Sequence, residues 1–230
     1  MGISISVIIP AHNEAQSIGK VLTEIPNYVR EIIVVDNNST DQTSEVAQKF
    51  NAKVIQQKNI GYGNACLAGI QSLESNPPEV VVFLDADYSD YPGEMTQLIN
   101  PIKMGVADFV IGARKKNLRE SKSMTFPQIF GNWLACVLMR LIYKSRYTDL
   151  GPFRAIKWDT LKGFNMRDRT YGWTIEMQLK SLYHKTKYIE VPVRYRSRIG
   201  QSKISGTVKG TIMAGIKILG WIGKFHFSKK

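Results

Sequence analysis

Short apolar runs rich in β-branched residues alternate with helix-like segments along the first half of the chain. Five runs are predicted as strands, at residues 3–9, 31–36, 53–57, 80–84 and 109–112. The segments between them are predicted as helices, at residues 17–25, 43–50, 61–73 and 92–103. Strands that alternate with helices through short links indicate an α/β fold, with a mostly parallel central sheet and helices on both faces.

Two of the predicted helices follow pairs that have the form of a capping box. Asn13 with Gln16 precedes the helix at 17–25, and Ser39 with Gln42 precedes the helix at 43–50. In such a box the first side chain accepts a hydrogen bond from the backbone of the helix, and the second side chain reaches back. We therefore expect these four residues to cap their helices.

The predicted strand at 80–84 ends at two carboxylates, Asp85 and Asp87. Residues i and i+2 of a strand point to the same side, so both side chains should face one point. Two close carboxylates favour a shared proton or a bound cation. Hard oxygen ligands suit Mg²⁺ or Mn²⁺, with substrate phosphates completing the coordination. An isolated Asp-x-Asp pair is more often solvated, so the other strand ends decide between these interpretations.

Polar or small residues also follow the other predicted strands, at 10–14, 36–39 and 58–63 and at Arg114. Ligands of parallel α/β sheets bind at the carboxyl ends of the strands, so these segments predict one binding site. A dinucleotide-binding fold is disfavoured, because no glycine follows the first strand. The Gly61-x-Gly63 pair also has Cys66 where a third glycine would be needed.

The charge balance predicts an anionic partner. The 230 residues carry 31 Lys and Arg against 19 Asp and Glu, a net charge of +12, which suits nucleic acid, a phosphorylated substrate or an acidic membrane surface. The two cysteines have no metal-site spacing and are expected to be reduced core thiols of a cytosolic protein. The N-terminus lacks the features of a secretory signal. The longest uncharged stretch, 123–139, is too short and too polar for a membrane span.

The second half of the chain leaves two alternatives open. Residues 126–143 have helical apolar spacing, which favours a core helix over a membrane-contacting one. A helix is predicted at 173–184 and a strand at 188–195. Glu176 lies near the start of this helix, and it is either a first-turn acid facing the helix dipole or a residue of the site.

The C-terminal tail combines an anion-binding type of loop with a basic amphipathic helix. The loop at 198–203 gathers cations, a glycine and a hydroxyl. The helix has an apolar stripe with lysines around it, formed by Val208, Ile212, Ile216 and Leu219. Such a helix fits the surface of an anionic bilayer, and docking on the core is an equal alternative.

Six ordered blocks of the chain resemble known enzymes. Val7 to Glu14, Val34 to Asp41 and Leu84 to Asp87 resemble the three signature blocks of family-2 glycosyltransferases with the GT-A fold. The blocks at 149–155, 172–176 and 198–203 resemble the branch that contains dolichyl-phosphate mannose and glucose synthases. Those synthases usually carry Asp-Ala-Asp-Leu-Gln, whereas Tyr88-Ser89 follow here, which leaves metal ligation beyond the two aspartates open.

The resemblance implies roles for individual positions and a division of the chain. It implies a GT-A domain at 1–195, with a nucleotide-sugar half at 1–114 and an acceptor half at 115–195, followed by an acceptor loop and helix at 196–230. The implied nucleotide-sugar residues are Pro10, Ala11, Asn13, Glu14, Asp36, Asn38, Ser39, Lys58, Gly63, Asp85, Ala86 and Asp87. The implied acceptor-phosphate residues are Arg114, Arg198, Ser202 and Lys203. Asp85 and Asp87 would hold the Mg²⁺ or Mn²⁺.

The expected reaction moves a hexose from a UDP-glucose or GDP-mannose class donor to a polyprenyl or dolichyl phosphate. The second pKa of a phosphate monoester is about 6, so the acceptor is already anionic at neutral pH and needs no strong base. We expect in-line attack with inversion, with catalytic roles for Asp87 and Arg114. Asp149 is a candidate for a base or for acceptor positioning. The expected location is the cytoplasm, peripheral at the inner face of the plasma membrane.

Two other functions remain as alternatives. A glycosyltransferase of the same fold that acts on a saccharide hydroxyl, in cell-envelope polysaccharide synthesis, would need a general base and would gain nothing from the loop at 198–203. A nucleic-acid-binding protein is disfavoured, because the cations lie mainly outside the strand-end site and no recognised module is present. The sequence leaves open whether the donor nucleotide contains uracil or guanine, which sugar is transferred, which lipid accepts it and what the oligomeric state is.

Overall fold

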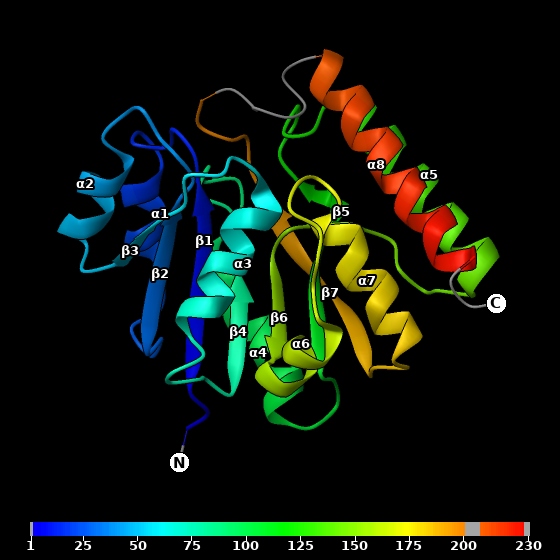
Figure 1. The fold of residues 1–230 in the computed structure, drawn as a ribbon, viewed down its shortest axis with the longest axis horizontal. Helices are drawn as coiled ribbons and strands as arrows, with labels where there is room; N and C mark the ends of the chain where they lie inside the picture. The colour runs from blue at the N-terminus through cyan, green and yellow to red at the C-terminus, as the bar shows by residue number, and fades with distance from the viewer. Residues whose placement is uncertain (1, 201–207, 228–230) are drawn as a thin grey trace.

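A single twisted sheet organises the molecule. The computed structural model describes residues 2–200 and 208–227, and these form a seven-stranded sheet (Figure 1). In chain order the strands are β1 (Ile5–Ala11), β2 (Glu31–Asp36), β3 (Lys53–Gln56), β4 (Val80–Phe83), β5 (Phe109–Arg119), β6 (Arg154–Lys157) and β7 (Tyr188–Tyr195). Their spatial order is β3-β2-β1-β4-β6-β5-β7, and of the described strands β6 alone runs antiparallel to its neighbours. The expectation of a mostly parallel α/β sheet is confirmed.

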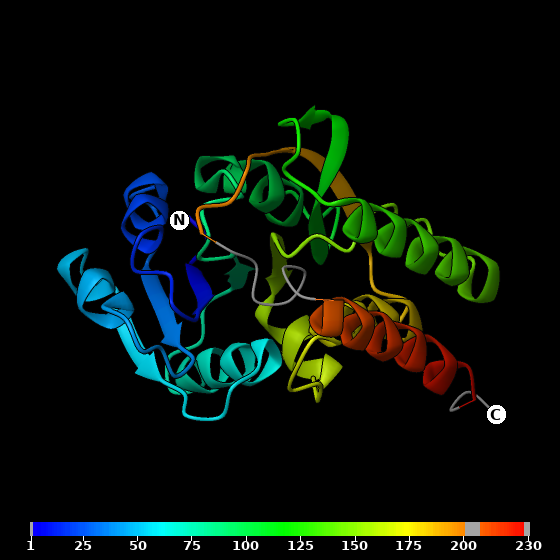
Figure 2. The same ribbon diagram turned by 90° about the horizontal axis from the view of Figure 1, so that it is seen from above.

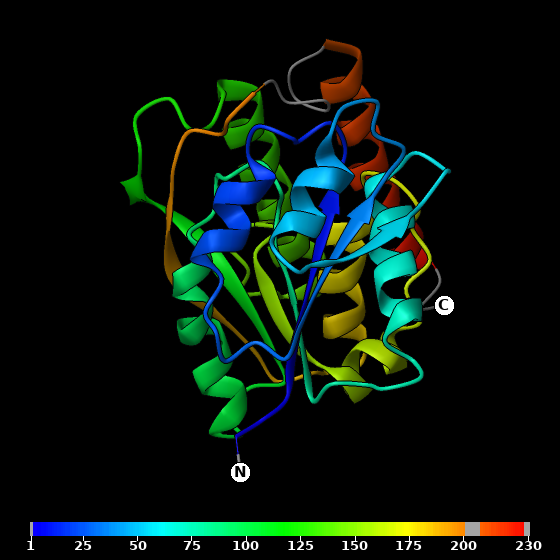
Figure 3. The same ribbon diagram turned by 90° about the vertical axis from the view of Figure 1, so that its left-hand side faces the viewer.

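Helices cover both faces of the sheet (Figure 3). They are α1 (Ile18–Glu24), α2 (Thr43–Lys49), α3 (Tyr62–Ser72), the 3₁₀ turn η1 (Pro92–Glu94) with α4 (Met95–Lys103), α5 (Phe126–Tyr143), α6 (Trp158–Phe164), α7 (Trp173–Tyr183) and α8 (Val208–Phe227). One core cluster joins the sheet to α1, α2 and α4, and the other joins it to α3, α5, α6 and α7.

The β4 strand shows why its sequence has no polar position. Val80 and Val82 belong to one core cluster, and Val81 and Phe83 belong to the other. All four side chains are buried, as expected for a central strand that is covered on both faces. Burying each such side chain contributes roughly 1.5–3 kcal/mol. This strand therefore fixes the position of the carboxylates that follow it.

The two expected capping boxes are not formed. Neither α1 nor α2 has a side-chain cap. The backbone N–H of Asn13 instead donates to Ser39 Oγ at 2.9 Å, and the backbone N–H of Thr40 donates to Asn13 Oδ1 at 2.7 Å. The parallel pairing of β1 with β2 brings the two following loops together, so each side chain accepts a hydrogen bond from the backbone of the other loop. They join two strand ends rather than capping helices.

Helix α5 has the predicted bounds, but only one of its sides is in the core. Ala135, Cys136 and Met139 are buried. Phe126 is 78% exposed, Trp133 56% and Leu141 73%. The expectation of a core helix is wrong for this outer side, because helical spacing reveals an apolar face but not what covers it.

Helix α8 lies against α5 and α7, beside the end of the sheet that β5 and β7 form (Figure 2). Ile222 is buried in this contact, and Tyr143 Oη donates to the Ile222 carbonyl at 2.5 Å. Met213, Ile216 and Leu219 are exposed. The side chains of Val208 and Ile212 lie outside the described residues. The helix is thus docked on the protein and also presents an apolar face to solvent. The expected division at residue 114 falls within β5 and stays a prediction.

Candidate active site

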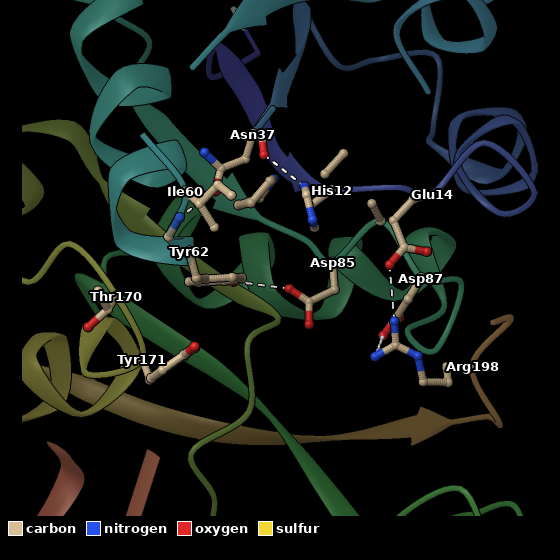
Figure 4. A pocket seen from close by; sticks show the side chains of 14 residues that line it. His12, Glu14, Asn37, Ile60, Tyr62, Asp85, Asp87, Thr170, Tyr171 and Arg198 are labelled. Atoms are coloured by element: carbon tan, nitrogen blue, oxygen red, sulfur yellow. Dashed lines mark hydrogen bonds and ion pairs between the residues drawn. The ribbon is translucent and has the colours of Figure 1, made fainter. Parts of the chain in front are cut away.

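A cavity of about 400 Å³ lies at the carboxyl ends of β1, β2 and β4, and we call it the strand-end cavity (Figure 4). Its walls come from the loops after these strands, the start of α3, residues 170–171 and the segment after β7. Seven of the predicted site residues line it, namely Pro10, Ala11, Glu14, Asp85, Ala86, Asp87 and Arg198. The strand-end loops therefore meet as the sequence predicts.

The two aspartates after β4 face this cavity in different environments. Tyr62 Oη donates to Asp85 Oδ1 at 3.0 Å. Asp87 Oδ1 accepts from both the backbone N–H and the hydroxyl of Ser89, at 2.9 and 2.5 Å. Burial, together with the negative charge of Asp87, raises the pKa of Asp85 to about 7. Near neutral pH this pair therefore favours a bound proton or a cation.

Arg198 provides a protein cation at this position. One guanidinium nitrogen lies 3.0 Å from Asp87 Oδ2, and another donates to Glu14 Oε1 at 3.0 Å. The Ile199 backbone N–H also donates to the Asp87 carbonyl at 2.9 Å. The segment after β7 is thus attached to the carboxylates after β4. Ser202 and Lys203, predicted in the same loop, lie outside the described residues.

Four of the predicted nucleotide-sugar residues do not line the cavity and instead belong to the hydrogen-bonded turn after β2 and the loop that it contacts, namely Asn13, Asp36, Asn38 and Ser39. Asp36 Oδ1 accepts from the Ser39 backbone N–H at 2.8 Å, and Asp36 Oδ2 accepts from the Ser44 hydroxyl. Burial alone would raise the pKa of Asp36, but hydrogen bonds from Ser39 and Ser44 outweigh it and lower that pKa. Asn38 has a φ of 62°, and Asn13 bonds to the loop of Ser39 as described above. These residues shape the turn after β2.

Asn37 belongs to the predicted strand-end segment 36–39 but was assigned no individual role, and its side chain fixes the loop before α3. Asn37 Nδ2 donates to the carbonyls of Gln57 and Asn59 at 3.0 and 2.7 Å, and Asn37 Oδ1 accepts from the Gly61 N–H at 2.7 Å. A polar residue that lines the cavity therefore also positions its neighbouring wall. Lys58, in the same loop, is exposed and is not among the lining residues.

The glycines at the start of α3 allow two backbones to meet. A Cβ on Gly61, whose φ is +147°, would lie 2.2 Å from the Arg169 carbonyl oxygen. A Cβ on Gly63 would lie 2.1 Å from that of Asp168. The Gly63 N–H donates to the Thr170 carbonyl at 3.2 Å. Gly61-x-Gly63 is thus a packing motif. Tyr62 lies in the predicted segment 58–63, whereas the sequence contains no signal for the lining residues Thr170 and Tyr171.

Two buried acids hold the 168–172 turn that completes this wall. Glu176 is fully buried and accepts from the backbone N–H groups of Arg167 and Asp168. Asp168 Oδ1 accepts from the N–H groups of Thr170 and Gly172 at 2.7 and 3.0 Å, and Asp168 Oδ2 accepts from Trp221 Nε1 of α8 at 2.6 Å. Glu176 thus supports a turn of the site wall and does not itself line the strand-end cavity.

Arg114 and Asp149 form a two-pronged ion pair beside a second cavity. Arg114 Nε and Nη2 donate to the two carboxylate oxygens of Asp149, at 2.8 and 2.7 Å, and the Arg114 backbone N–H donates at 2.8 Å. Burial would raise the pKa of Asp149, but the charge and hydrogen bonds of Arg114 outweigh it and lower that pKa. The Asp149 carboxylate is therefore held in its ionised form.

This second cavity, which we call the basic cavity, has a volume of about 280 Å³ and lies between β5 and α5. Asp149 is the one acid among its described lining residues. The cations that line it are Arg114, Lys115, Lys116, Arg119 and Arg140. Sequence reasoning identified only the first of these, although Lys115, Lys116 and Arg119 follow it on β5, and Arg140 comes from α5.

The residues of the strand-end cavity fit a divalent cation bound together with a phosphorylated ligand. Asp85 and Asp87 provide hard oxygen atoms, and the raised pKa of Asp85 reflects a site that gains from added positive charge. Among residues 2–200 and 208–227, no group of three His, Cys, Asp or Glu side chains could hold a metal by itself. The donor set therefore suits Mg²⁺ or Mn²⁺ with phosphate oxygens as further ligands.

The order of the sheet and the pair of aspartates after β4 are those of a GT-A glycosyltransferase. The model of the family "Glycosyl transferase family 2" matches residues 6–171. The chain therefore belongs to glycosyltransferase family 2, as its motifs predict. This family is a class of enzymes whose members differ in the sugar donor and in the acceptor.

Sequence relatives include enzymes that act on lipid phosphates. An uncharacterised glycosyltransferase of Mycobacterium tuberculosis is 32% identical over 216 residues, which cover 93% of this chain and 95% of the relative. The undecaprenyl-phosphate mannosyltransferase of Micrococcus luteus is 27% identical, covering 91% and 90%. The dolichol-phosphate mannosyltransferase of Pyrococcus furiosus is 28% identical, covering 96% of this chain and 65% of that enzyme.

Solved structures support the same fold. Glucosyl-3-phosphoglycerate synthase of Mycobacterium tuberculosis, in complex with Mn²⁺, UDP and glucosyl-3-phosphoglycerate, superposes with a TM-score of 0.75. It is 20% identical, and the match covers 96% of this chain and 81% of that one. This likeness establishes the GT-A fold.

Proposed function

We propose that this enzyme transfers a hexose, with inversion, from a nucleotide-diphosphate sugar to a polyprenyl or dolichyl phosphate. The observation that carries the proposal is the basic cavity beside the exposed apolar side of α5. A phosphate needs the cations, and a polyprenyl chain needs the apolar surface. The chain would divide as the resemblance implies, with donor residues in 1–114, acceptor residues in 115–195 and a membrane-facing tail in 196–230.

The strand-end cavity is the proposed donor site. Asp85 and Asp87 would hold Mg²⁺ or Mn²⁺, which when bound neutralises the charge that develops on the leaving diphosphate. The loops that contain Pro10, Ala11 and Glu14 would surround the nucleoside, supported by the turn of Asp36, Asn38 and Ser39. Because Arg198 already pairs with Asp87, its guanidinium is well placed to turn toward a diphosphate.

The basic cavity is the proposed acceptor-phosphate site. Asp149 holds the Arg114 guanidinium in a fixed orientation, so it acts as a positioning residue rather than as a base, in accord with its lowered pKa. An acceptor phosphate with a second pKa of about 6 is largely dianionic at neutral pH and can attack without losing a proton. Attack opposite the diphosphate gives a β-linked product from an α-linked donor.

Peripheral contact with an anionic membrane would bring the lipid to this site. Residues 191–230 contain nine Lys and Arg and no Asp or Glu, and residues 121–148 contain four and none. These two stretches include α8 and α5, which lie side by side and expose Phe126, Phe130, Trp133, Ile216 and Leu219. Apolar side chains among cations favour an anionic bilayer surface. Within residues 2–200 and 208–227, no helix is long and apolar enough to cross a membrane.

A soluble phosphorylated acceptor is the second candidate. The cations of the basic cavity would bind the phosphate of a small acid as well as that of a lipid, and the glucosyl-3-phosphoglycerate synthases share the fold. Such an acceptor would leave the exposed aromatic residues of α5 without a role. A saccharide hydroxyl acceptor would leave the five cations without a role, and it would also require a base.

The test is product formation from a panel of UDP- and GDP-sugars, with and without Mn²⁺ or Mg²⁺. The acceptors are polyprenyl phosphate, 3-phosphoglycerate and no acceptor, and Asp87→Ala is assayed in parallel. Metal-dependent transfer to the lipid, lost in the variant, supports the proposal and names the donor. Transfer to 3-phosphoglycerate alone, or hydrolysis alone, would contradict the lipid acceptor.

A further inference from the structure

A third cavity, of about 380 Å³, lies between the end of α6, α7 and the last turns of α8, and it shares no lining residue with the two cavities described above. We call it the aromatic cavity. Its walls include Tyr183 and His184 from the end of α7 and Trp221 and Phe225 from α8, as well as Phe164 of α6. No step of the proposed reaction uses this cavity, and its composition differs from that of the strand-end cavity.

The aromatic rings of this cavity pack on one another and leave an apolar wall. The Tyr183 and Phe225 rings are 6.3 Å apart, and those of Trp221 and Phe225 are 5.9 Å apart. His184 stacks on Phe164 at 5.6 Å. Tyr183 is 56% exposed, so the wall opens to the surface. Tyr and Trp rings in such half-exposed positions are suited to the boundary between water and a bilayer.

The charges that line the aromatic cavity are mainly positive. Glu176 is the one acid among the described lining residues, and it is fully buried and neutralised by Lys180 at 2.8 Å. Arg167 and Lys224 also line the cavity and are exposed, and Lys224 lies over the Trp221 ring at 5.4 Å. The cavity therefore combines a net positive charge with an apolar wall, which suits an amphiphile with an anionic group.

We propose that the aromatic cavity binds the phosphate headgroup of an anionic membrane lipid, distinct from the acceptor lipid. The phosphate would lie between Arg167 and Lys224, and the first methylene groups would contact Trp221 and Phe225. A lipid is favoured over a free phosphate because α8, which forms one wall, exposes Ile216 and Leu219 in its preceding turns. The inference rests on the proposed membrane contact but not on the identity of the glycosyl acceptor.

The test compares two variants that have the same net charge. Arg167→Gln with Lys224→Gln removes the cations of the aromatic cavity. Lys49→Gln with Lys103→Gln removes two exposed cations elsewhere. Lys49 lies on α2, at the opposite end of the molecule from α8 (Figure 1). Lys103 lies at the end of α4, on the other face of the sheet from α7. Each protein is sedimented with phosphatidylcholine vesicles that contain increasing fractions of phosphatidylglycerol.

We expect the wild type and the Lys49/Lys103 variant to bind more tightly as phosphatidylglycerol increases. The Arg167/Lys224 variant should lose roughly 10- to 30-fold in affinity for the anionic vesicles, since each basic residue near such a surface is worth about fivefold. Its binding to pure phosphatidylcholine and its melting temperature should not change. Equal losses in both variants, or no loss in the Arg167/Lys224 variant, would overturn the proposal.

A second measurement separates the headgroup from free phosphate. If inorganic phosphate binds the wild type but not the Arg167/Lys224 variant, while both sediment alike, the cavity takes free phosphate and the lipid assignment is wrong. Glycosyl transfer to polyprenyl phosphate is measured in detergent in parallel. A failure of that reaction would leave the sedimentation result unchanged, so the two proposals are tested independently.

Discussion

The Arg198 guanidinium lies 3.0 Å from Asp87 Oδ2, so a carboxylate that is suited to a metal is paired with a cation of the protein itself. A divalent ion at Asp85 and Asp87 would have to displace this guanidinium or share the carboxylate with it. The segment after β7 is tied to the same residue by the Ile199 N–H, so metal binding and the position of this segment are linked.

Arg198→Ala is therefore expected to bind Mn²⁺ more tightly than the wild type, by roughly tenfold, because a like charge close to the ion is removed. Arg198→Lys, which keeps the charge, is the matched control and should stay near the wild-type affinity. Calorimetric titration or the Mn²⁺ electron paramagnetic resonance signal measures both without any turnover. Unchanged Mn²⁺ affinity in Arg198→Ala would mean that the guanidinium does not compete with the metal.

The raised pKa of Asp85 predicts a specific pH dependence of stability. Between about pH 4, where an unfolded aspartate ionises, and about pH 7, where Asp85 ionises in the folded protein, only the folded state keeps this proton. The free energy of unfolding should therefore fall as the pH rises through this window. Asp85→Asn should lack this contribution, which denaturant unfolding at several pH values would reveal.

Added Mn²⁺ should act in the opposite direction. A metal ligand must be deprotonated, so Mn²⁺ should stabilise the wild type more at pH 8 than at pH 5. The same ion should have little effect on Asp85→Asn. An equal Mn²⁺ effect on both proteins would place the metal elsewhere.

The Arg114–Asp149 pair should be sensitive to the loss of one partner. Asp149→Asn leaves the buried Arg114 guanidinium without its counter-charge, which is expected to cost about 3–5 kcal/mol of unfolding free energy. The double change Arg114→Met with Asp149→Leu should recover much of this stability, because it removes both charges. Urea unfolding measures the difference. The double variant should nevertheless be inactive, since the acceptor phosphate would lose its fixed cation.

The exposed aromatic residues of α5 should contribute to membrane binding in the absence of anionic lipid. Phe130→Gln with Trp133→Gln is expected to weaken binding to phosphatidylcholine vesicles by tenfold or more, because each ring buries a large apolar area. Met104→Gln, at a 70% exposed position at the end of α4, is the control. Equal binding of both variants would argue against α5 as the contacting helix.

The strand ends could be predicted from the sequence because a contiguous run of β-branched residues indicates a strand without reference to the rest of the fold. The run at 80–84 determines both β4 and the place where Asp85 and Asp87 emerge. The cross-loop bonds of Asn13 and Ser39 could not be predicted, since they arise from the pairing of β1 with β2. Arg198 was expected near an acceptor phosphate, but its contact with Glu14 depends on how the chain returns after β7.

Helix α8 braces one wall of the strand-end cavity from outside. Trp221 and Lys217 bind one carboxylate oxygen of Asp168, and the other oxygen holds the turn whose Thr170 and Tyr171 line the strand-end cavity. A protein shortened by this helix would keep every sheet strand but lose the brace of that turn. Nucleotide affinities measured on such a shortened form would therefore underestimate those of the full chain.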